Sequence, residues 1–72
     1  MFIKSSSHEV WFNVKNGKKV GLLARVPELL RLDLISTGPS FTTEDLNSWL
    51  YLEKSGRYIV FSTREEAEAA LA

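Results

Sequence analysis

The clearest pattern of apolar and polar positions lies on either side of Asn16-Gly17. Residues 9–15 and residues 19–25 both carry apolar side chains at alternating positions. Alternation of this period is typical of β-strands, and Asn-Gly favours the tight turn of a hairpin. The chain is therefore predicted to contain an antiparallel hairpin close to its N-terminus.

The length of the hairpin loop decides which side chains share a face of the sheet. With a two-residue loop, Phe12 would lie opposite Gly21 and the two faces would be mixed. A three-residue loop, residues 15–17, places Phe12 opposite Val20 and keeps one face apolar. Because a slip of one residue moves every side chain to the other face, we predict the three-residue loop.

Residues 27–35 have a pattern that fits two structures. Pro27 is suited to the first turn of a helix, and leucine is a good helix former. On a helix, however, the leucines would spread around the whole circumference, whereas on a strand Leu30, Leu32 and Leu34 share one face. We predict a strand here, with a helix as the alternative.

The pattern that follows predicts the main helix of the fold. Thr42 is a good N-cap, Asp45 stands in the capping-box position, and Ser55-Gly56 is a typical C-terminal stop. The expected buried stripe of this helix consists of Leu46, Trp49 and Leu50.

The C-terminal part is predicted to form a strand and a short helix. Residues 57–61 are apolar on both sides, and Thr63 with Glu66 can cap a helix that offers only Ala67, Ala70 and Leu71 to the core. Residues 1–72 are thus expected to be a single α+β domain. It would have a small antiparallel sheet of three to four strands that includes the N-terminal hairpin, one main helix and a short C-terminal helix.

Composition limits the chemistry that this chain can support. Among its 72 residues there is no cysteine and one histidine, His8. Disulfides and thiolate zinc sites are therefore excluded, and we expect no metal or other cofactor. No signal peptide or membrane span is evident in the sequence, so the expected location is cytoplasmic, without membrane contact.

The candidate catalytic groups have simpler explanations. Ser5, Ser6 and Ser7 precede His8, but neighbours on an extended segment point to opposite sides, whereas nucleophilic catalysis needs the base beside the nucleophile. The acidic pairs lie where helix first turns are predicted, where the helix dipole favours them. We therefore expect neither an enzyme nor a small-molecule substrate.

The second face of the predicted sheet suggests a protein interface. If the helices cover the face that contains Phe12, the reverse face keeps exposed apolar side chains, which are typical of interfaces. The predicted anchors are Trp11, Leu23, Tyr58 and Val60. We expect a non-enzymatic protein-interaction module, either self-associating or acting as a small regulatory or inhibitory protein of the kind common among phage and mobile-element products.

The hairpin also has the elements of a single-strand nucleic-acid site. Basic side chains alternate with the aromatic Trp11, and such sites stack bases on aromatic rings while cations hold the phosphates. The candidate residues are Asn13, Lys15, Lys18, Lys19 and Arg25. The formal net charge of zero argues against this function, because nucleic-acid-binding domains are usually basic. Nucleic-acid binding is therefore the alternative.

Overall fold

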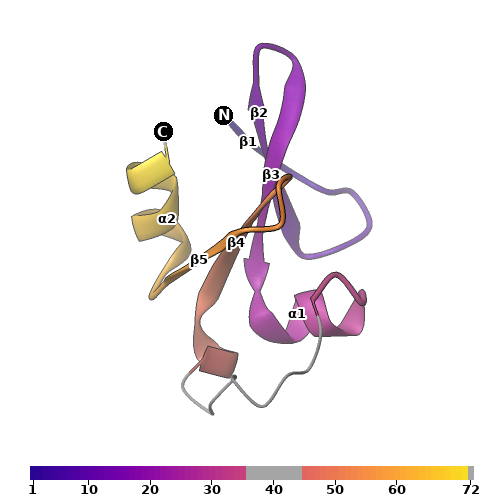
Figure 1. Ribbon diagram of the computed structural model, residues 1–72, viewed down its shortest axis with the longest axis vertical. Coiled ribbons are helices and arrows are strands. Elements are labelled where there is room, and N and C mark those ends of the chain that lie inside the picture. The colour runs from indigo at the N-terminus through magenta and orange to yellow at the C-terminus, as the bar shows by residue number, and fades with distance from the viewer. Residues whose placement is uncertain (36–44, 72) are drawn as a thin grey trace.

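Five antiparallel strands form one sheet in the computed structural model, which describes residues 1–35 and 45–71 (Figure 1). The strands lie in sequence order: β1 (Phe2–Lys4), β2 (Val10–Lys15), β3 (Lys18–Arg25), β4 (Trp49–Glu53) and β5 (Tyr58–Phe61). The remaining elements are α1 (Val26–Arg31), a 3₁₀ turn (Asp45–Asn47) and α2 (Arg64–Leu71). The α+β class is confirmed, and the sheet has five strands where three to four were predicted.

The predicted hairpin is confirmed, but its loop has two residues rather than three. Lys15 pairs with Lys18, which leaves Asn16 and Gly17 as the turn. Both turn residues have positive φ, 53° and 76°. This is the backbone of a type I′ turn, whose twist matches that of the strands and for which Asn-Gly is the preferred sequence.

A bulge explains why the argument from loop length failed. The pairing of β2 with β3 shifts between Asn13 and Val14, so Val20 is an extra residue on β3. Beyond this bulge, Phe12 faces Leu22 instead of Val20. The extra residue restores the match of apolar positions that a three-residue loop was expected to provide.

Residues 26–31 form α1, so the predicted strand over residues 27–35 is wrong and the helical alternative is correct. Pro27 lies in the first turn, where its missing N–H costs nothing, whereas in a strand it would remove a ladder hydrogen bond. Val26 and Leu29, three residues apart, are both fully buried. The helix therefore packs one narrow stripe against the sheet.

The predicted main helix is also wrong, because residues 49–53 form β4. On a helix, Tyr51 and Leu52 would lie off the buried stripe. On a strand inside the sheet, successive side chains can pack into the apolar clusters on both faces. Leu50 and Tyr51 are accordingly both buried, on opposite faces, whereas Leu46 is exposed. The predicted cap at Thr42 lies outside the described residues.

The C-terminal predictions are confirmed. β5 occupies residues 58–61 and α2 follows it. The backbone N–H of Glu66 donates a hydrogen bond of 3.0 Å to Oγ1 of Thr63, which is the expected cap. Ala67 is the buried residue of this short helix.

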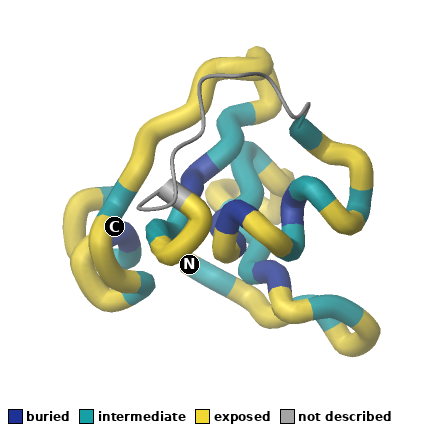
Figure 2. Tube along the Cα trace, turned by 90° about the horizontal axis from the view of Figure 1, so that it is seen from below, coloured by how far each residue is buried: buried dark blue, intermediate teal, exposed yellow. Residues whose placement is uncertain are grey.

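Two apolar clusters lie on opposite faces of the sheet. We call the face that carries Phe12, Leu22 and Leu52 the Phe12 face; it packs against α1. The other, the Trp11 face, carries Leu23 and Tyr51 and packs against α2. Figure 2 shows that the buried positions are concentrated in the middle of the fold, with exposed loops around them.

Candidate protein-binding surface

The middle of the Trp11 face is buried, contrary to the prediction, whereas Trp11 itself is half-buried. The ring of Trp11 packs edge-on against Trp49, with centroids 5.4 Å apart, and the guanidinium of Arg64 in α2 lies 4.6 Å from the Trp11 ring centroid. Leu23 has no exposed surface. Leu23 therefore cannot contact a partner, and Trp11 is a half-buried member of the apolar cluster on this face.

A buried polar side chain also lies on this face. Asn13, only 1% exposed, donates a hydrogen bond of 3.0 Å from Nδ2 to the hydroxyl of Tyr51. The ring of Tyr51 lies across Gly21, where a Cβ would overlap the ring and its hydroxyl. Asn13, a predicted nucleic-acid contact, is thus buried, and its side chain holds the phenol in place inside the protein.

On the Phe12 face, α1 covers one row of side chains and leaves the next row partly exposed. The covered row runs across the inner strands through Val10, Ala24 and Leu50, all buried. The next row toward the β2–β3 turn crosses all five strands through successive paired residues. We call it the open row: Ile3, Phe12, Leu22, Leu52 and Tyr58.

Every residue of the open row is large and apolar, yet none is buried. Ile3 and Tyr58, at its two ends, are 48% and 52% exposed, and the three residues between them are half-buried. Val60, at the β5 end of the covered row, is 44% exposed. Two of the four predicted anchors, Tyr58 and Val60, are therefore at the surface, on the Phe12 face.

Sequence reasoning missed the rest of the open row because it assigned Phe12 and Leu22 to the covered side. A signal was nevertheless present, since the segment that could cover this face is short. The nine residues 27–35 would form a helix only about 14 Å long. The distance from β1 to β5 across the sheet is roughly 19 Å. One such helix cannot cover the whole face.

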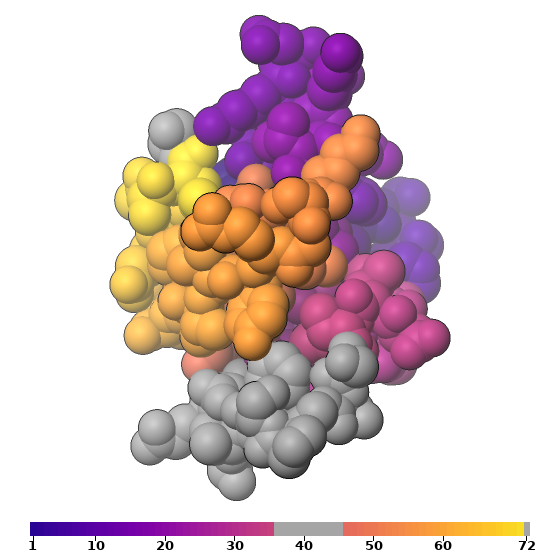
Figure 3. Space-filling model, viewed as in Figure 1, coloured from indigo at the N-terminus to yellow at the C-terminus, as the bar shows by residue number. Residues whose placement is uncertain are grey.

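Basic side chains border the open row toward the β2–β3 turn. The ammonium of Lys19 lies 4.2 Å from the ring centroid of Phe12. Two lysines, Lys19 and Lys54, and one acidic residue, Glu53, line a shallow hollow of about 410 Å³ over Phe12, Leu22 and Leu52. In Figure 3 the turn between β2 and β3 stands clear of the remaining atoms at the top of the molecule. The open row is thus accessible and has a cationic border.

The predicted basic patch is divided between two places. Lys15, Lys18 and Lys19 are exposed at the hairpin tip. Arg25 is at the far end of β3, roughly 20 Å away at 3.3 Å per residue. There it lines a separate hollow of about 440 Å³ with Trp11 and Trp49. The lysines and the tryptophan therefore do not form one site.

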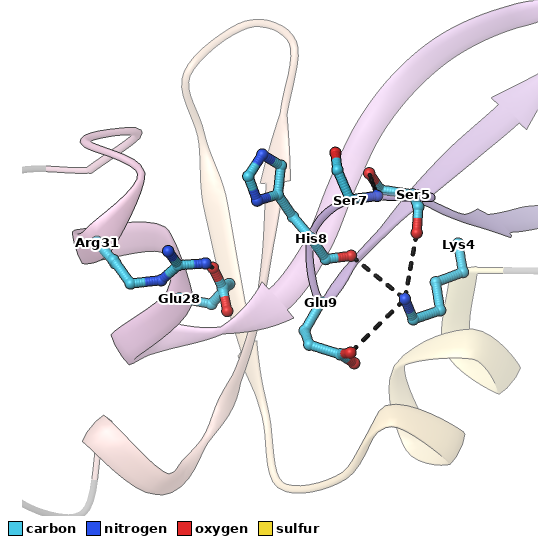
Figure 4. Close-up of polar contacts among 7 residues, drawn as sticks. All are labelled: Lys4, Ser5, Ser7, His8, Glu9, Glu28 and Arg31. Atoms are coloured by element: carbon cyan, nitrogen blue, oxygen red, sulfur yellow. Dashed lines mark hydrogen bonds and ion pairs between the residues drawn. The ribbon is translucent and has the colours of Figure 1, made fainter.

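The loop between β1 and β2 is organised by Lys4 (Figure 4). Its ammonium donates hydrogen bonds to the carbonyl oxygens of Ser5 (3.1 Å) and His8 (3.4 Å) and lies 3.6 Å from the carboxylate of Glu9. Within the described part of the chain, the His8 imidazole makes no hydrogen bond to a serine hydroxyl. The Ser-His stretch is a loop held by a lysine.

Comparison with known proteins assigns no family. No family model, no curated protein and no solved structure matches this chain. Across residues 1–35 and 45–71, no three His, Cys, Asp or Glu side chains gather as metal ligands. Over the same residues, no helix has the length and hydropathy needed to cross a membrane. The surface geometry is therefore the basis for a functional proposal.

Proposed function

We propose that this protein is a non-enzymatic protein-interaction module, of a regulatory or inhibitory kind, that binds its partner through the open row. The observation that carries the proposal is the continuity of this row, which crosses all five strands without a charged side chain. Small soluble proteins rarely leave so much contiguous apolar side-chain surface accessible unless something binds it.

The border of the row indicates the chemistry of the partner. Lys19 and Lys54 flank the hollow over Phe12, and both side chains are exposed. A partner segment with an apolar face and an acidic flank would complement this surface, with the apolar contacts providing affinity and the charges orientation. Binding should therefore weaken moderately, without disappearing, as the salt concentration rises.

The test is affinity capture from nuclease-treated lysate of the source cells with two matched variants. Ile3→Ser with Tyr58→Ser removes both exposed ends of the open row. Leu46→Ser is the control, because Leu46 is an exposed apolar residue of the 3₁₀ turn, outside the row. A protein captured by the wild type and the control, but lost by the double variant, is the expected result. Equal capture by all three proteins would contradict the proposal.

Single-stranded nucleic acid is a second candidate partner, which the contact of Lys19 with Phe12 favours. A cation beside an aromatic ring can hold a phosphate next to a stacked base. Fluorescence anisotropy with a labelled mixed-sequence oligonucleotide at low salt tests it. Binding that falls steeply with salt and is lost on replacing Lys15, Lys18 and Lys19 with Ser would support this candidate; no binding would eliminate it.

A further inference from the structure

Apart from its length of only four residues, the free edge of β5 lacks the features that usually protect the edge of a sheet. Natural edge strands carry a charge, a proline or a bulge, or are very short. β1, at the opposite edge, has three residues and includes Lys4. β5 has four apolar residues, pairs with β4 residue for residue, and exposes Ile59 and Val60 by 36% and 44%.

The backbone of β5 is also oriented for pairing on its outer side. The N–H of Glu53 donates a hydrogen bond of 2.8 Å to the carbonyl of Arg57, immediately before β5. Inward and outward hydrogen bonding alternate along an antiparallel strand, so Ile59 is directed toward β4 and Val60 away from it. The peptide groups of Val60 therefore face whatever lies beyond the edge.

We propose that a second copy of this chain occupies this edge, with the two β5 strands antiparallel about a two-fold axis at Ile59. In this register Tyr58 of one copy faces Val60 of the other, and the two Ile59 residues face each other. Side chains of the Phe12 face then meet only side chains of the same face, as a continuous sheet requires. A shift by two residues would place Tyr58 opposite Ser62 and lose an apolar pair.

The charges on either side of β5 are complementary in the same arrangement. Lys54 and Arg57 precede the strand, whereas Glu65 and Glu66 lie in the first turn of α2 just after it, and all four are exposed. Antiparallel pairing brings the basic end of one strand beside the acidic end of the other. Because the formal net charge of the chain is zero, two copies have no overall repulsion to overcome.

This dimer does not rest on the open row binding a partner, although it would join the two rows end to end. Tyr58 ends the open row in each copy and would lie beside Val60 of the other. The face for partner binding and the edge for self-association share Tyr58 and otherwise consist of different residues. Ile3, at the β1 end of the row, takes no part in the edge contact, so Ile3→Ser should leave dimer formation unchanged.

The absence of cysteine allows a test of the register by cross-linking. In the proposed dimer, the two Cα atoms at position 59 form a non-hydrogen-bonded pair about 4.5 Å apart, within the range that a disulfide can span. The Cα atoms at position 60 would be about 8 Å apart, because they are offset by two residues along the strands, and this is beyond disulfide reach. Under mild oxidation we expect Ile59→Cys to cross-link at least tenfold faster than the control Val60→Cys.

Sedimentation velocity of the unmodified chain provides an independent measurement. We expect a monomer–dimer equilibrium that shifts toward dimer with concentration and toward monomer with added salt. Ile59→Lys, which would place two ammonium groups on the axis, should remain monomeric while keeping the wild-type circular dichroism spectrum. A wild type that stays monomeric up to millimolar concentration, or equal cross-linking of the two cysteine variants, would overturn the proposal.

Discussion

On the Trp11 face, α2 packs beside the Trp11–Trp49 pair, and Tyr51 fills the space above Gly21. On the Phe12 face, α1 buries the row through Leu50 and leaves the row through Leu52 half-exposed. Both faces are apolar, so hydropathy alone does not distinguish them. The difference comes from how much surface the element beside each face can cover. It places the candidate binding surface opposite the face that the sequence suggested.

The largest expected effect separates the two rows of the Phe12 face. Leu50→Ala should lower the free energy of unfolding by about 3 kcal/mol, because truncating a fully buried leucine leaves a cavity. Leu52→Ala, two residues along the same strand and on the same face, should cost only about 1 kcal/mol, because its side chain is partly solvated already. Urea denaturation of both variants measures the difference. Equal losses would show that the open row is as closed as the covered one.

The close packing of the Trp11 face is tested at Gly21. Gly21→Ala should destabilise the protein by about 2 kcal/mol, because the added methyl group would overlap the Tyr51 ring. Thermal denaturation measures this loss. Combining the change with Tyr51→Leu, which removes the ring and hydroxyl from this position, should reduce the cost of the methyl group; strictly additive losses would show that Tyr51 does not lie over Gly21.

A smaller effect is expected when the buried hydrogen bond of the Trp11 face is broken. Tyr51→Phe removes the acceptor of the Asn13 amide and should cost about 1 kcal/mol. Urea denaturation of the variant and the wild type measures the loss. An unchanged stability of Tyr51→Phe would mean that Asn13 is satisfied in another way.

The smallest effect on stability is expected at the end of the open row. Ile3→Ser should change the free energy of unfolding by no more than about 0.5 kcal/mol, since nearly half of this side chain is already in water. The same change should weaken binding of the partner. A large loss of stability would place Ile3 in the core and would remove it from the proposed surface.

The sequence predicted the elements whose signals are local. Asn16-Gly17 defines its hairpin and Thr63 caps its helix, because both depend on backbone geometry within a few residues. The segments at Pro27 and Trp49 were assigned incorrectly because tertiary contacts decide them. Leucine-rich stretches fit either a helix or a strand, and only the neighbouring strands determine which form buries more side chains.

The candidate surface was predicted only in part, for the same reason. Tyr58 and Val60 belong to a strand that was assigned correctly, and both are exposed. Leu23 and Asn13 were predicted to lie at the surface because residues 49–53 were expected to form a helix. No strand carrying Tyr51 was therefore expected beside them on the Trp11 face. The one-residue bulge in β3 changed the pairing of the hairpin, and residues 26–31 form a helix where a strand was predicted. These two differences decide which face of the sheet is covered.

The most direct test of the central claim compares two neighbouring positions on β3 that point to opposite faces. In this cysteine-free chain, Leu22→Cys and Leu23→Cys each introduce one thiol, and labelling by a thiol reagent under native conditions reports its exposure. We predict that the thiol at position 22, on the open row, reacts at least tenfold faster than the thiol at position 23, which is fully buried on the Trp11 face. Faster labelling at position 23, or equal protection of both thiols, would contradict the account.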